Sequence, residues 1–185
     1  MDTTTIAAAR YSRGAIALHW TIAVLIVLNI AAAWVSEGMS KADRAMVMGN
    51  HKAIGLIILA LSLAMLVWRL MHKPPPLVQT LKPWEAGLAK VVHFALYALM
   101  IGLPLTGWAM VSGFSKGKPV SIFGLFDVPA LPVGVEKAVI ENYAGLHGLF
   151  GFAMVGLVAI HVAGALKHHF IDRDGTLRRI MPGMR

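Results

Sequence analysis

Five histidines lie inside long apolar stretches of the sequence, where an ionisable side chain is unfavourable and usually serves a function. They are His19, His51, His93, His147 and His161. His147 and His161 are 14 residues apart in one stretch. On an α-helix, 14 residues rise about 21 Å and return to within about 40° of the same face. The two imidazoles are therefore expected to point the same way near opposite ends of one helix.

Antiparallel neighbouring helices would give each of these two histidines a partner at its own depth. His51 is expected to meet His147 near one end of the bundle, and His19 is expected to meet His161 near the other. A small residue stands one turn after each of these four histidines: Ala23, Gly55, Gly151 and Ala165. Because residues i and i+4 share a helix face, this spacing leaves room for a flat ring beside each imidazole.

Haem is the cofactor that suits two facing imidazoles. Most metal ions need more ligands, whereas a porphyrin supplies four nitrogens and leaves two axial positions for protein side chains. The chain has no cysteine, which excludes covalent haem attachment and iron–sulfur ligation. We therefore predict two b-type haems, with the iron ligands His19 and His161 in one site and His51 and His147 in the other. His93 has no small neighbour one turn later, and its role stays open.

Four segments are apolar and long enough to hold these histidines within a membrane, since about 20 helical residues cross a hydrocarbon core of about 30 Å. They lie near 14–36, 47–70, 91–112 and 143–166. The composition agrees, with 57% apolar and 14% charged residues in a chain of 185. The expected fold is all-α, an integral membrane four-helix bundle in which residues 1–185 form a single domain.

The connections between these segments differ in character. The second, near 71–90, contains Pro74, Pro75, Pro76 and Pro83 and is expected to be a loop. The third, near 113–142, mixes glycine and proline with large apolar residues. That mixture predicts a segment that lies on the membrane surface and packs over the bundle.

The basic residues predict the orientation. Eleven fall at the end that carries both termini and the second connection: Arg10, Arg13, Arg69, Lys73, Lys82, Lys90, Lys167, Arg173, Arg178, Arg179 and Arg185. Six fall at the opposite end: Lys41, Arg44, Lys52, Lys116, Lys118 and Lys137. Because Lys and Arg accumulate on the cytoplasmic side, both termini are predicted in the cytoplasm. The net charge of +8 is explained by this bias and by contact with anionic membrane lipid, so no nucleic-acid partner is expected.

Several motifs accompany the histidines along the chain. They read RYSRGAIALHW, GNHKAIG, GLAKVVHFALYALMIGLPLTG and HVAGALKHHFIDRDGTLRRIMP. Together they resemble the bacterial cytochrome b561 family over nearly the whole chain. The resemblance implies a multi-pass protein of the bacterial inner membrane, with the His19–His161 haem on the cytoplasmic side. Lys90 stands where that pattern would have a histidine, but no proposed ligand is lost.

Within that family the chain is similar to the superoxide oxidases, which implies an oxidoreductase that takes electrons from superoxide, releases oxygen and reduces ubiquinone. Superoxide is an anion, so Lys52 could raise its encounter rate beside His51, or could instead pair with a haem propionate.

Quinone reduction also requires protons. His168 is the first candidate to supply them because imidazole titrates near neutral pH. Ser12 and Arg13 fall on the same side and are expected to help bind the quinone, and Asp172 and Asp174 could relay protons from water.

Two other functions fit the same residues. The chain could be a cytochrome b subunit that relays electrons between a dehydrogenase or hydrogenase and quinone. It could also be a haem-free transporter whose histidines carry a proton or a metal ion. The superoxide oxidase interpretation requires no protein partner, whereas the subunit interpretation does.

Overall fold

The computed structural model describes residues 10–76, 78 and 81–183. Four long helices dominate this part of the chain: α1 (Arg13–Val35), α2 (Lys41–Met71), α3 (Pro83–Phe114) and α4 (Lys137–Leu166). Each is long and apolar enough to cross a membrane. The shorter elements are η1 (Ser36–Gly38), β1 (Val120–Ile122), β2 (Phe126–Val128) and η2 (Lys167–Ile171). The expected all-α membrane bundle is confirmed.

Three of the helices begin earlier than the apolar stretches indicated. The segment near 71–90 was expected to be a loop, yet α3 starts at Pro83. Proline fits the first helical position because it has no N–H to lose, and the Glu85 carboxylate accepts a hydrogen bond from the Lys82 amide at 3.0 Å. Likewise α2 begins at Lys41 rather than near 47, and α4 at Lys137 rather than near 143. Apolar length predicts the part of a helix inside the membrane, and the polar turns extend beyond it.

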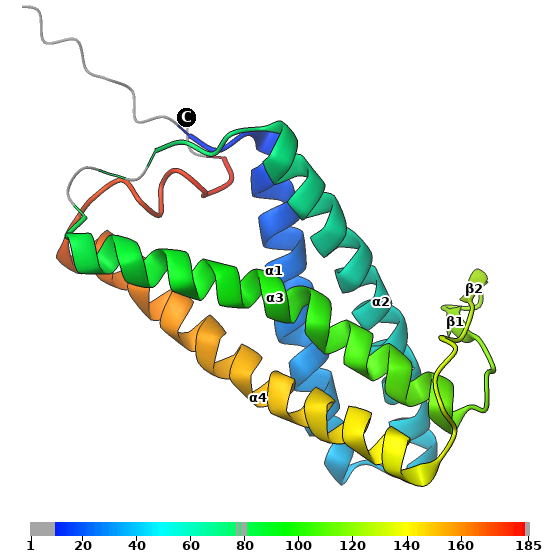
Figure 1. Ribbon diagram of the computed structural model, residues 1–185. Helices are drawn as coiled ribbons and strands as arrows, with labels where there is room; N and C mark the ends of the chain where they lie inside the picture. The colour runs from blue at the N-terminus through cyan, green and yellow to red at the C-terminus, as the bar shows by residue number, and fades with distance from the viewer. Residues whose placement is uncertain (1–9, 77, 79–80, 184–185) are drawn as a thin grey trace, which may run out of the picture.

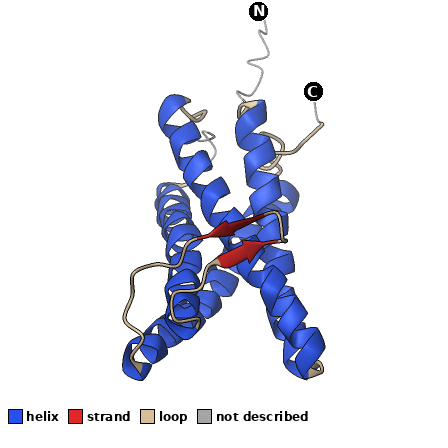
Figure 2. Cartoon of the chain, turned by 90° about the vertical axis from the view of Figure 1, so that its right-hand side faces the viewer, coloured by secondary structure: helices blue, strands red, loops and turns tan. Residues whose placement is uncertain are grey.

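The helices form two antiparallel pairs that cross. α1 packs along α2, α3 packs along α4, and α2 also contacts α3. Figures 1 and 2 show the α3–α4 pair crossing the α1–α2 pair at an angle. We call the end where α1 begins and α4 ends the terminal end, and the opposite end, where β1 and β2 lie, the hairpin end (Figure 1). Arg185, counted among the basic residues of the terminal end, lies outside the described residues.

The apolar side chains face outward as much as inward. A small core holds Ile22, Ile26, Ile58, Met65 and Met154. Many other large apolar side chains on all four helices are exposed. Such a surface would be unfavourable in water but is normal against lipid chains, which agrees with a bundle that spans a membrane.

The third connection folds into a short hairpin. β1 and β2 pair antiparallel, and Phe123 and Gly124 turn the chain between them with positive φ angles of 53° and 74°. Val120 and Ile122 are buried, and β1 contacts α2. The segment therefore packs over the hairpin end as expected, although its strands were not foreseen.

Candidate functional site

His51 on α2 and His147 on α4 form the hairpin-end pair. Their ring centroids are 6.2 Å apart. His51 Nδ1 lies 3.1 Å from the backbone oxygen of Asn29, and His147 Nδ1 lies 3.0 Å from that of Leu103. A carbonyl oxygen only accepts hydrogen bonds, so each Nδ1 carries the proton. This fixes both tautomers and leaves each Nε2 with a free lone pair, as a metal ligand requires.

Two cavities of about 320 and 410 Å³ meet at this pair. Both are lined by the two histidines, Gly55 and Pro104. Gly148 and Gly151 also line the first cavity, and a Cβ atom at either would meet no other atom within 4 Å. The glycines thus leave open space beside the imidazoles, which suits a flat ring that extends into both cavities.

His19 on α1 and His161 on α4 form the terminal-end pair, with ring centroids also 6.2 Å apart. His93 on α3 joins them, because its ring centroid lies 5.3 Å from that of His161. His19 Nδ1 is buried and has no hydrogen-bond partner among the described residues. This end therefore holds three imidazoles, and within the described part of the chain none shows a carbonyl bond like those that orient the hairpin-end pair.

The spacing of both pairs fits two axial ligands of one iron. An imidazole nitrogen binds a metal at about 2.0 Å and lies about 1.1 Å from its ring centre, so two opposed imidazoles have centres about 6.2 Å apart. Both expected pairs have this separation, whereas His93 and His161 are closer. Two nitrogen ligands in an apolar setting suit a porphyrin, which provides the remaining four.

Comparison with known proteins identifies the family. The family model described as prokaryotic cytochrome b561 matches residues 10–183. The chain belongs to the prokaryotic cytochrome b561 family. The protein is thus a multi-pass membrane cytochrome b with a role in electron transfer, and the family implies haem b as its cofactor. The haem-free transporter considered from the sequence is not supported.

Three relatives of this cytochrome b561 are informative. Cytochrome b561 homolog 2 of Escherichia coli K12 is 35% identical over 132 residues, 71% of this chain and 68% of that protein. Cytochrome b561 homolog 1 of the same organism is 29% identical over 94% of this chain and 97% of its own length. The probable superoxide oxidase CybB of Yersinia pestis is 27% identical over 95% of this chain and 98% of its own length.

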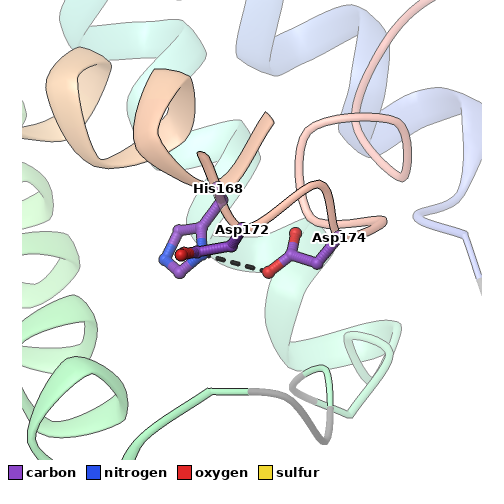
Figure 3. Close-up of side chains that lie close together, drawn as sticks. All are labelled: His168, Asp172 and Asp174. Carbon is purple, nitrogen blue, oxygen red and sulfur yellow. Dashed lines mark ion pairs between the residues drawn. The ribbon is translucent and has the colours of Figure 1, made fainter. Parts of the chain in front are cut away.

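His168 lies where α4 passes into η2, a π-helical turn, and is held by two carboxylates. Figure 3 shows His168, Asp172 and Asp174 gathered together. His168 Nδ1 lies 2.8 Å from Asp172 Oδ2 and 3.0 Å from Asp174 Oδ2. Burial raises the pKa of Asp174, but hydrogen bonds from Thr176 and the nearby His168 outweigh it, so the net pKa is lowered and Asp174 is charged at neutral pH.

These three side chains are close enough to hold a metal ion, but a cation already shares the cluster. Lys167 Nζ lies 2.6 Å from the same Asp172 Oδ2 and 2.7 Å from Glu85 Oε1. An ammonium group in this position repels a second cation. The cluster is therefore an ion-pair network around His168.

Ser12 and Arg13 lie at the same end but on the other helix pair. Ser12 caps α1, accepting hydrogen bonds from the Ala15 amide and from Trp68 Nε1. Arg13 is exposed. Among the described residues, no hydrogen bond or ion pair joins Ser12 or Arg13 to His168. The structure therefore does not bring the three predicted quinone-site residues into direct contact.

Lys52 is exposed at the hairpin end and lines the larger cavity together with Ser115. This places an ammonium group at the edge of the space beside His51. Lys116 and Lys118 follow the end of α3 at the same end of the bundle. Lys137 is instead paired with Glu141 at 3.6 Å.

Some residues of the site were missed in the sequence. Asn29 could have been found from the sequence, because an amide side chain is unusual within an apolar helix, and the structure shows that it is buried. Gly107 faces His147, and a Cβ atom there would lie 2.8 Å from the imidazole Cε1. Nothing in the sequence separates this glycine from the others.

The Glu85–Lys167 ion pair should stabilise the terminal end by joining α3 to α4. Glu85 is 8% exposed, so Glu85→Gln is expected to lower the free energy of unfolding by more than the loss of a fully exposed ion pair would. Thermal unfolding in detergent measures this change. Glu141→Gln, which breaks the exposed Lys137–Glu141 pair, is the control and should change stability by less than about 0.5 kcal/mol. Equal melting temperatures for both variants would contradict the expectation.

Proposed function

We propose that this cytochrome b561 takes electrons from superoxide at its hairpin end and delivers them to ubiquinone at its terminal end. His51 and His147 would hold one haem b, and His19 and His161 a second. The observation that carries this proposal is the equal 6.2 Å spacing of two histidine pairs that share α4. The haems would supply one-electron transfer between the two ends of the bundle.

The family and the charges support the proposed location and orientation. The chain is proposed to lie in the bacterial inner membrane, in agreement with its prokaryotic cytochrome family. Both termini would lie in the cytoplasm, because most basic residues gather at the terminal end. The hairpin end would then face the periplasm. The probable superoxide oxidase named among the relatives covers nearly the same length, which supports superoxide as the donor.

The histidine pairs limit what chemistry can occur. Two imidazoles at each site would hold the haem, which would supply electron transfer rather than oxygen binding. Superoxide would therefore need only to approach the hairpin end closely. Lys52, beside His51 at the edge of the cavity, would attract this anion.

The terminal end would serve the quinone. Each superoxide gives up one electron and becomes oxygen, while two electrons and two protons convert one quinone to quinol. His168 would donate a proton to the quinone oxygen and recover it from water through Asp172 and Asp174, which already hold its Nδ1. Ser12 and Arg13 would border the quinone from α1.

The test measures the two halves of the reaction separately on purified protein in detergent. A superoxide pulse without quinone should reduce the haems, which is seen as the absorption bands of the reduced form. Added ubiquinone should reoxidise the haems and restore the oxidised bands. Lys52→Gln should slow the first half by about two- to fivefold at low salt and leave the second unchanged. His168→Gln should slow reoxidation by about 10²-fold or more and leave reduction by superoxide unchanged.

Matched controls come from the same surfaces. Lys41→Gln removes another exposed cation from the first turn of α2, and His169→Gln removes the histidine next to His168. Both should behave as wild type. Haems that dithionite reduces but superoxide does not would contradict the proposal and would favour a cytochrome fed by a partner dehydrogenase or hydrogenase.

A further inference from the structure

Asn29 is a buried polar residue that packing does not explain. It lies in the second half of α1, between Leu28 and Ile30, and is 6% exposed. Its Oδ1 atom is buried and has no hydrogen-bond partner among the described residues. Apolar side chains would fill this position at lower free energy, so an amide here calls for a functional reason.

Asn29 and His51 are joined by two reciprocal hydrogen bonds. The Nδ1–H of His51 donates to the Asn29 backbone oxygen at 3.1 Å, and Asn29 Nδ2 donates to the His51 backbone oxygen at 3.3 Å. A carbonyl oxygen has two lone pairs, so the backbone oxygen of Asn29 can accept a hydrogen bond from the imidazole in addition to the hydrogen bond within its own helix. The side-chain amide of Asn29 thus fixes the position of α2 along α1. In this position the His51 ring reaches the backbone oxygen of Asn29.

We propose that Asn29 is the positioning residue of the hairpin-end haem, acting through His51. Asn29 also lines the first cavity, so it reaches the ring site from α1 while His51 reaches it from α2. By keeping the Nδ1–H bonded, Asn29 makes the imidazole more electron-rich and fixes its direction. The inference rests on the proposed ligation by His51.

The two histidine pairs differ in this respect. His147 has a comparable bond to the Leu103 oxygen, with Thr106 Oγ1 3.4 Å from its Nδ1. His19 Nδ1 has no such partner in the part of the chain that the structure describes. An electron-rich imidazole stabilises oxidised iron, so the proposed hairpin-end haem should have the lower midpoint potential of the two.

The test is a redox titration of the haem-loaded Asn29→Leu variant, followed optically and by electron paramagnetic resonance. One haem should show a raised midpoint potential and a changed low-spin signal, and the other should not change. That haem should also pass to apomyoglobin roughly tenfold faster. The shifted signal should be the one that is missing from His147→Ala.

Ser62→Ala provides the matched control. Ser62 is 1% exposed on α2, and its hydroxyl also has no partner among the described residues. This variant should leave both potentials unchanged. Asn29→Ala repeats the test with a smaller side chain, and selective loss of the same haem in either Asn29 variant would also support the proposal.

Two results would overturn the inference. Unchanged potentials in both Asn29 variants would show that the amide does not act on the haem. Equal shifts of both haems, or loss of both, would show a general loosening of the bundle. A wild-type protein without two haems would instead refute the proposed ligation itself, so the two failures are distinguishable.

Discussion

Replacing His147 by alanine is expected to lower the haem content from about two per chain to about one. The cavities at the hairpin end would lose one of two opposed ligands, and the remaining His51 would bind a haem only weakly. The terminal-end pair lies at the other end of α4 and does not share these cavities. The loss should therefore be confined to one haem, which pyridine haemochrome assay against protein concentration measures.

The partner residue and an unrelated histidine complete this test. His51→Ala should give the same ratio and remove the same low-spin signal as His147→Ala. His72→Ala should retain both haems, because His72 lies at the end of α2, stacked on Trp68 with ring centroids 4.2 Å apart. A ratio of about two in a folded His147→Ala protein would show that the hairpin-end pair does not hold haem.

His161→Ala is expected to remove the other haem and to abolish quinone reduction. His161 contacts both His19 and His93, with ring centroids at 6.2 and 5.3 Å. Only the longer separation matches two ligands on opposite sides of one iron. His19→Ala should therefore lose the same haem as His161→Ala, whereas His93→Ala should retain it.

The comparison of His19 and His93 decides between two ligand sets. The measurements are the haem ratio, the low-spin resonance signal and ubiquinone-dependent reoxidation of each variant. Retention in His19→Ala together with loss in His93→Ala would assign the ligand to α3 instead of α1. Size-exclusion profiles identify any variant that fails to fold.

The approach of the paired histidines could be predicted because it depends on few quantities. Helix rise and turn place His147 and His161 on one face, and antiparallel neighbours supply partners at equal depth. The small residues were also informative, since Gly55 and Gly151 line the cavity beside the hairpin-end pair. In the structure the ring centroids of each pair lie 6.2 Å apart, and haem ligation by these histidines is our proposal.

Other features could not be predicted from apolar length or from one helix considered alone. Apolar length could not show that α3 begins at Pro83, because Glu85 provides the capping bond. The reciprocal bonds between Asn29 and His51 join two helices, so they could not be inferred from either one. The contact of His93 with His161 depends on how the helix pairs cross. The π-helical turn that places His168 near Asp172 has no sequence signature that we can name.

The most direct test of the account is the haem content and absorption spectrum of the detergent-purified wild-type protein. We predict about two b-type haems per chain, both low-spin in the oxidised and reduced forms, because each iron would have two histidine ligands. One haem per chain, or a high-spin fraction close to one half, would contradict the paired-histidine arrangement.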